Sequence, residues 1–90
     1  MAWIVNYTES SLRKLKKMDK STSNKIVDFI DNRIGTLDDP RTIAKQLKGK
    51  LGSYWSYRIG DYRIICDLQN DELIILIVDL GHRKFIYKKN

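Results

Sequence analysis

The 90-residue chain has few of the residues that cross-link small domains, bind structural metals or anchor proteins in membranes. Cys66 is its only cysteine, which excludes an internal disulfide and suits a reducing cytosol. Because the chain also has a single histidine, a structural zinc site is not expected. The longest aliphatic run, Leu73–Val78, has six residues, whereas a transmembrane helix needs about 20. The N-terminus lacks a basic segment followed by an apolar one, so we predict a cytoplasmic protein with no membrane partner, metal or other cofactor.

Positive charge is the main excess in the composition. The 17 lysines and arginines outnumber the 11 acidic residues, which gives a formal net charge of +6. Residues 1–39 carry +1 of this charge and residues 40–90 carry +5. The asymmetry favours a localised surface that binds a polyanion. The alternative is that the positive charge serves only to keep the protein soluble, which would give the same composition.

The first half of the chain predicts a strand and two helices. Apolar residues alternate over residues 3–7, as in a strand. Thr8 is a typical N-cap for a helix whose apolar face includes Leu12 and Leu15. A second amphipathic helix is predicted from about residue 22 to 36. Its apolar stripe consists of Ile26, Val27, Ile30, Ile34 and Leu37.

The second half predicts three strands after an irregular basic segment at residues 41–53. The strands cover residues 54–59, 62–68 and 72–80, and Gly60-Asp61 and Asn70-Asp71 are expected to form two-residue hairpin turns. The element order is therefore β-α-α-β-β-β in one domain over residues 1–90. We predict an α+β fold in which a two-helix hairpin packs on one face of a small antiparallel sheet.

These turns also predict which side chains share a face of the sheet. Arg58 should lie opposite Arg63, while Arg63 should lie opposite Val78 and Tyr62 opposite Asp79. The face expected to meet the helices is apolar and contains Trp55, Tyr57, Ile59, Tyr62, Ile64, Cys66, Leu73, Ile75 and Ile77. The opposite, outer face is expected to contain Tyr54, Ser56, Arg58, Arg63, Ile65, Asp67, Ile74, Leu76, Val78 and Leu80.

Two features of the predicted outer face suggest function. Like charges directly across a sheet are destabilising, so Arg58 and Arg63 are better explained by a phosphate between them. The alternative is that each pairs with Asp61, Asp67 or a carboxylate near the C-terminus. The aliphatic residues on this face also exceed what an exposed sheet needs, so either the C-terminal residues of the chain or a protein partner covers them. They are Ile65, Ile74, Leu76 and Val78. Ten residues after Leu80 are few for this task, which favours a partner.

Candidate reactive groups are concentrated near the C-terminus. His82, Arg83, Lys84 and Tyr87 lie within six positions, after a glycine that permits a bend. Taken alone, His82 is equally well explained as a structural histidine and Tyr87 as a packed aromatic residue.

Four segments in this order resemble the RelE/ParE superfamily, the toxins of type II toxin–antitoxin modules, and its RelE branch in particular. They are Trp3–Thr8 with Leu12–Asp19, Asp39–Arg41 with Leu47–Gly49, Tyr57–Ile65, and Gly81–Tyr87. The resemblance implies the β-α-α-β-β-β fold and a toxin that cleaves mRNA in the ribosomal A site without a metal. It also implies neutralisation by a RelB-like antitoxin that wraps around the toxin, and binding to operator DNA only through that complex.

The positions that match the family's functional residues are Arg63, Arg83 and Tyr87, with His82 and Arg58 beside them. Metal-free RNA cleavage needs a base for the 2′-hydroxyl, a cation for the phosphate and an acid for the leaving 5′-oxygen. Arg63 suits the phosphate, and Arg83 suits either the phosphate or the leaving oxygen. Tyr87 can be the base if nearby cations lower its pKa from about 10. His82 has the pKa best suited to acid–base work.

Further RNA contacts are expected from the other basic residues of this half, Arg58, Lys48, Lys50 and Lys84. One position departs from the family, because Ser56 stands where many relatives have a basic residue; Arg58, Lys48 or Lys50 is expected to substitute for it. Two alternative functions remain open. One is a ParE-like inhibitor of DNA gyrase, and the other is a non-catalytic module that binds RNA or the ribosome.

Overall fold

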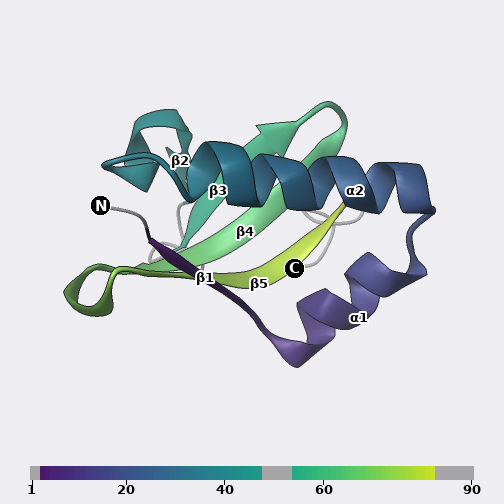
Figure 1. Cartoon of the computed structure of the whole chain (residues 1–90), viewed down its shortest axis with the longest axis horizontal. Coiled ribbons are helices and arrows are strands. Elements are labelled where there is room, and N and C mark those ends of the chain that lie inside the picture. Colours follow the sequence, from purple (N-terminus) through teal and green to yellow (C-terminus); the bar gives the residue numbers. More distant parts are fainter. Residues whose placement is uncertain (1–2, 48–53, 83–90) are drawn as a thin grey trace.

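The computed structural model describes residues 3–47 and 54–82 and has two helices packed on a five-stranded sheet (Figure 1). The elements in chain order are β1 (Ile4–Tyr7), α1 (Glu9–Lys17), α2 (Lys20–Phe29), a π-helical segment (Ile30–Ile34), a 3₁₀ turn (Pro40–Ile43), β2 (Lys45–Gln46), β3 (Trp55–Ile59), β4 (Tyr62–Gln69), a second 3₁₀ turn (Asn70–Glu72) and β5 (Ile74–His82). This arrangement confirms the predicted α+β fold class.

The sheet has the strand order β1-β5-β4-β3-β2 and differs from the prediction in two respects. It is mixed, because β1 pairs in parallel with β5 while the other pairs are antiparallel. The helices between β1 and the rest of the chain provide the crossover that a parallel pair requires. The sheet also gains β2 within the segment that we expected to be irregular.

The helices begin at capped residues. Thr8 Oγ1 accepts a hydrogen bond from the Ser11 amide at 3.2 Å, which confirms Thr8 as the N-cap of α1. Asp19 caps α2 in the same way through the Thr22 amide at 3.1 Å. The Thr22 hydroxyl, which donates to Asp19 at 2.7 Å, and the Thr22 amide hold the pKa of Asp19 below its ordinary value. The predicted apolar face of α1 was wrong at Leu12, which is exposed.

The core lies between the helices and one face of the sheet, and α2 crosses that face (Figure 1). Its helical residues are Leu15, Ile26, Ile30 and Ile34, and its sheet residues are Tyr57, Ile64, Cys66, Leu68, Ile75, Ile77 and Leu80. Alternation along the strands therefore places most of the predicted inner residues correctly.

The predicted register between β4 and β5 was wrong. Arg63 lies opposite Gly81 and Tyr62 opposite His82, rather than opposite Val78 and Asp79. Two residues of this displacement arise in the connection between the strands. A 3₁₀ turn, followed by Leu73 with a positive φ of 54°, replaces the predicted two-residue turn. The dipeptide Asn70-Asp71 lacks the glycine that a tight hairpin turn favours.

The remaining residue of the displacement comes from a β-bulge. Cys66 pairs with Ile77 whereas Ile65 pairs with Asp79, so Val78 is the extra residue in β5. The bulge reverses the alternation of the strand beyond Val78. Leu80, which we predicted on the outer face, therefore lies in the core opposite Ile64.

Candidate nucleic-acid interface

Two arginines stand directly across from each other on the outer face, as the first hairpin predicted. Arg58 of β3 pairs with Arg63 of β4, and the turn between them is Gly60-Asp61, where Gly60 has a φ of 57°. Glycine takes this conformation without steric cost. Arg58 is exposed and Arg63 is half-buried. The hairpin therefore places two arginine side chains on the same face of the sheet, next to its turn.

Local contacts hold Arg63 in place. Its Nη1 donates to the Tyr62 carbonyl at 3.1 Å and to the Gly60 carbonyl at 3.4 Å. A guanidinium pair of this kind suits a phosphate, whose oxygens accept several charge-assisted hydrogen bonds.

Gly81 is the neighbour of this arginine pair on β5. It lies opposite Arg63 in β5 and contributes no side chain to the outer face. A glycine within a strand is often found where a ligand approaches the backbone closely.

Lys45 is a basic residue of the outer face that the sequence analysis missed. It pairs with Ser56 across the β2–β3 ladder, so the two side chains share a face, and Lys45 is exposed. Lys45 thus lies beside Ser56, where the family resemblance implies a basic residue, and Ser56 is two residues along β3 from Arg58. A strand of two residues has no periodic signal, so only the three-dimensional pairing reveals this placement.

The segment that carries Lys45 is fixed by buried and half-buried contacts. The Tyr57 hydroxyl donates to the Pro40 carbonyl at 2.6 Å, and burial raises the pKa of Tyr57 above its ordinary value. The Arg41 guanidinium lies 5.8 Å from the centre of the Trp55 ring and forms an ion pair with Asp39 at 2.9 Å. These contacts attach residues 39–47 to β3.

His82 lies apart from the arginine pair. Because it pairs with Tyr62, it shares the helix-facing side of the sheet, and its ring meets the Tyr62 ring edge-on with the centroids 5.5 Å apart. The structure therefore joins Arg58, Arg63 and Gly81 on one face and places His82 on the other. The candidates Lys48, Lys50, Arg83, Lys84 and Tyr87 lie outside the described residues.

The described residues show neither a metal cluster nor a membrane span. Among them, no three side chains of histidine, cysteine, aspartate or glutamate come together as metal ligands. No helix among residues 3–47 and 54–82 is long and apolar enough to cross a membrane. Cys66 is buried in the core, which raises the pKa of its thiol.

A family model described as the ParE toxin of the type II toxin–antitoxin system parDE matches residues 5–87. The chain belongs to this toxin family. The toxin is 25% identical to Toxin RelG of Mycobacterium tuberculosis (strain ATCC 25618 / H37Rv) over 89 residues, which cover 99% of this chain and 100% of the relative.

Solved toxin–antitoxin structures share the toxin's fold. The RelBE2 complex from Mycobacterium tuberculosis superposes with a TM-score of 0.84 at 23% identity, covering 92% of this chain and 100% of the other. The archaeal RelE–RelB complex from Pyrococcus horikoshii OT3 gives a TM-score of 0.71 at 24% identity, covering 94% and 99%. The predicted membership of the RelE/ParE superfamily is thus confirmed, and the protein is a toxin of a type II toxin–antitoxin system.

Proposed function

We propose that this toxin is a ribosome-dependent, metal-independent endoribonuclease that cuts mRNA in the ribosomal A site and thereby inhibits translation. The observation that carries the proposal is the Arg58–Arg63 pair beside Gly81 on the outer face. Two arginine side chains on the same face of a hairpin can bind the oxygens of an RNA phosphate from both sides. The similarity to curated toxins named RelG and RelE supports the same function.

The chemistry uses the substrate's own 2′-hydroxyl. Its oxygen attacks the adjacent phosphorus, the bond from phosphorus to the 5′-oxygen breaks, and the products carry a 2′,3′-cyclic phosphate and a 5′-hydroxyl. Arg63, with Arg58 next to it, stabilises the charge that develops on the phosphate oxygens. Lys45 binds a neighbouring phosphate from the next strand and supplies the cation that Ser56 lacks.

Proton transfer is assigned to the residues after β5. Tyr87 takes the proton of the 2′-hydroxyl, Arg83 assists at the phosphate or at the leaving oxygen, and Lys48, Lys50 and Lys84 bind the RNA backbone. His82 is the second candidate for acid–base work. Because His82 and the arginine pair lie on opposite faces of the sheet, an RNA that reaches both has to pass around the end of β5.

The cognate partner is a RelB-like antitoxin that neutralises the toxin, and operator DNA is bound only through the complex of the two, in the cytoplasm. Half-exposed Ile74 and Leu76 on the outer face and exposed Ile4 at the sheet edge provide an apolar contact surface. Ile65, also expected in this surface, is instead buried at 4% exposure and unavailable for a partner. Structures similar to this fold are RelE–RelB complexes.

A second candidate function is inhibition of DNA gyrase, which the name of the matching ParE toxin family favours. The two functions differ in what the toxin does to RNA. A nuclease generates new mRNA ends within codons, whereas a gyrase inhibitor arrests growth without them.

Induced expression in bacteria, followed by mapping of mRNA 5′ ends, tests the proposal. Wild type should produce cuts at in-frame positions within translated codons, and Arg63→Ala and Tyr87→Phe should abolish them. Arg33→Ala is the matched control, because Arg33 is an exposed arginine of the π-helical segment. Growth arrest without such cuts would refute cleavage and favour gyrase.

A further inference from the structure

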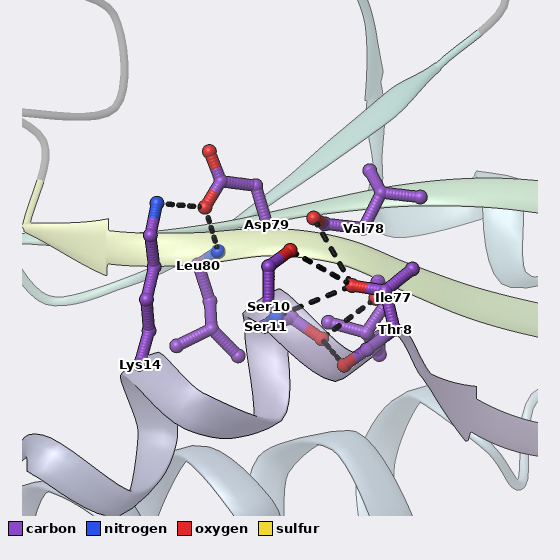
Figure 2. A network of polar contacts seen from close by, with 8 residues as sticks. All are labelled: Thr8, Ser10, Ser11, Lys14, Ile77, Val78, Asp79 and Leu80. Carbon is purple, nitrogen blue, oxygen red and sulfur yellow. Dashed lines mark hydrogen bonds and ion pairs between the residues drawn. The ribbon is translucent and has the colours of Figure 1, made fainter.

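A set of polar contacts fastens the start of α1 to β5 (Figure 2). The Thr8 amide donates to the Ile77 carbonyl at 3.0 Å, and Ser11 Oγ lies 2.9 Å from the same oxygen. Thr8 Oγ1 donates to the Val78 carbonyl at 3.4 Å, and Lys14 Nζ forms an ion pair with Asp79 Oδ1 at 2.5 Å. We call these contacts of Thr8, Ser11 and Lys14 with Ile77, Val78 and Asp79 the α1–β5 clasp.

The clasp coincides with the β-bulge. β1 ends at Tyr7, opposite Ile77, so the strand pairing on this side of β5 stops where Val78 is inserted. Beyond that point the N-cap Thr8 donates to the carbonyls of Ile77 and Val78, and Ser11 of α1 donates to the Ile77 carbonyl (Figure 2). Asp79 Oδ1 also accepts from the Leu80 amide at 2.9 Å, which ties the ion pair to the backbone of the bulge. Ser11 is fully buried in this contact.

The bulge determines which residue lies beside Arg63. In the observed register Gly81 lies opposite Arg63, and Leu80 lies in the core opposite Ile64. Without the extra residue, Leu80 would lie opposite Arg63 and Asp79 opposite Ile64. A leucine side chain would then lie beside Arg63 on the outer face, where the observed register has a glycine. The core favours the observed register as well, because burial of the Asp79 carboxylate would be costly.

We propose that Ser11 and Lys14 are positioning residues that hold the β5 bulge and so keep Gly81, rather than Leu80, beside the Arg63 guanidinium. The inference rests on the proposed RNA cleavage at Arg63. Ser11 and Lys14 do not touch the substrate. They act through the backbone of Ile77–Asp79, whose position sets how closely the scissile phosphate approaches Arg63.

The test compares two double variants in the full-length toxin. Ser11→Ala with Lys14→Ala removes the two clasp side chains, whereas Lys17→Ala with Ser21→Ala removes the same residue types from exposed positions outside the clasp. Single-turnover cleavage of mRNA on purified ribosomes gives the rate at saturation and the half-saturating ribosome concentration. The first variant should lose about ten-fold in the saturating rate, and the control should stay within about two-fold of wild type.

Two additional variants separate positioning from stability. Lys14→Arg, which preserves the charge opposite Asp79, should restore most of the rate that Lys14→Ala loses. Lys14→Ala alone replaces an exposed side chain, so it remains informative if the double variant unfolds at the assay temperature. Equal losses in the clasp and control variants, or no loss in either, would overturn the proposal.

The register is also measured without reference to activity. Nuclear Overhauser contacts between the Tyr62 and His82 rings report on the end of β5. They should weaken in the clasp variant and persist in the control, and full retention in the clasp variant would overturn the positioning role. If wild type fails to cleave, the proposed function fails, while the ring contacts still decide whether the clasp sets the register.

Discussion

The two faces of the β3–β4 hairpin are made by alternate residues of the same strands and have opposite properties. Tyr57 and Ile64 point to the helices and are buried, whereas their sequence neighbours Arg58 and Arg63 point outward as a pair of cations. Burial of the first pair stabilises the fold, while repulsion within the second opposes it. The difference teaches that stability and the proposed RNA binding can be tested separately by substituting adjacent residues.

The largest expected effect is on the outer face. Arg63→Ala should lower single-turnover cleavage of ribosome-bound mRNA about 100-fold, since a preorganised donor to the developing charge is lost. Its unfolding midpoint in urea should not fall below that of wild type, because the substitution also removes the repulsion from Arg58. If the variant keeps an activity within two-fold of wild type, Arg63 does not take part in cleavage.

The matching effect on the inner face is a loss of stability. Ile64→Ala should lower the free energy of unfolding by about 3 kcal/mol, because it leaves a cavity in the core at a fully buried residue. Urea denaturation monitored by tryptophan fluorescence measures this change. A variant as stable as wild type would show that this face does not form the core.

Loss of the Tyr57 hydroxyl should have a smaller effect. Tyr57→Phe keeps the ring but leaves the buried Pro40 carbonyl without its 2.6 Å hydrogen bond, so stability should fall by about 1 kcal/mol. Thermal unfolding detects the change. An unchanged melting temperature would mean that this bond does not anchor residues 39–47.

Lys45→Ala should weaken affinity and leave the chemistry intact. The half-saturating ribosome concentration should rise about three-fold at low salt with an unchanged saturating rate, as expected for one phosphate contact. The control is Lys20→Ala, an exposed lysine at the start of α2. Equal effects of the two substitutions would show that Lys45 contributes only general charge.

The smallest effect concerns high pH. Burial, with a lesser contribution from the Asp31 carboxylate, raises the pKa of Tyr7 from about 10 to about 12. Between these values the folded state holds a proton that the unfolded chain has lost, so stability should fall as the pH rises. Over this pH interval Tyr7→Phe should lose less free energy of unfolding than wild type, as measured by urea denaturation. Equal losses in the two proteins would contradict a raised pKa at Tyr7.

The sequence predicted the elements that depend on local patterns. Alternation and helical periodicity located β1, both helices, β3 and β4, and the Gly60-Asp61 turn correctly paired Arg58 with Arg63. Family motifs also led to the correct fold class and superfamily.

The misplaced features depend on contacts between distant segments. Tertiary packing fixes the parallel pairing of β1 with β5. The hydrogen bond from Tyr57 to Pro40 fixes the two-residue β2, and the contacts of α1 with Ile77–Asp79 fix the bulge at Val78. For that reason the sequence misplaced Leu80, missed Lys45 and left Gly81 unmatched with Arg63.

The central claim is that the outer face binds a phosphate that is attacked by the RNA's own 2′-hydroxyl. The most direct test uses purified ribosomes programmed with a short mRNA, once all-ribose and once with a single 2′-deoxynucleotide at the mapped cleavage position. Wild-type toxin should cut the all-ribose mRNA, leaving a 2′,3′-cyclic phosphate, and should leave the deoxy-substituted mRNA intact. Equal cleavage of both messages would contradict the account.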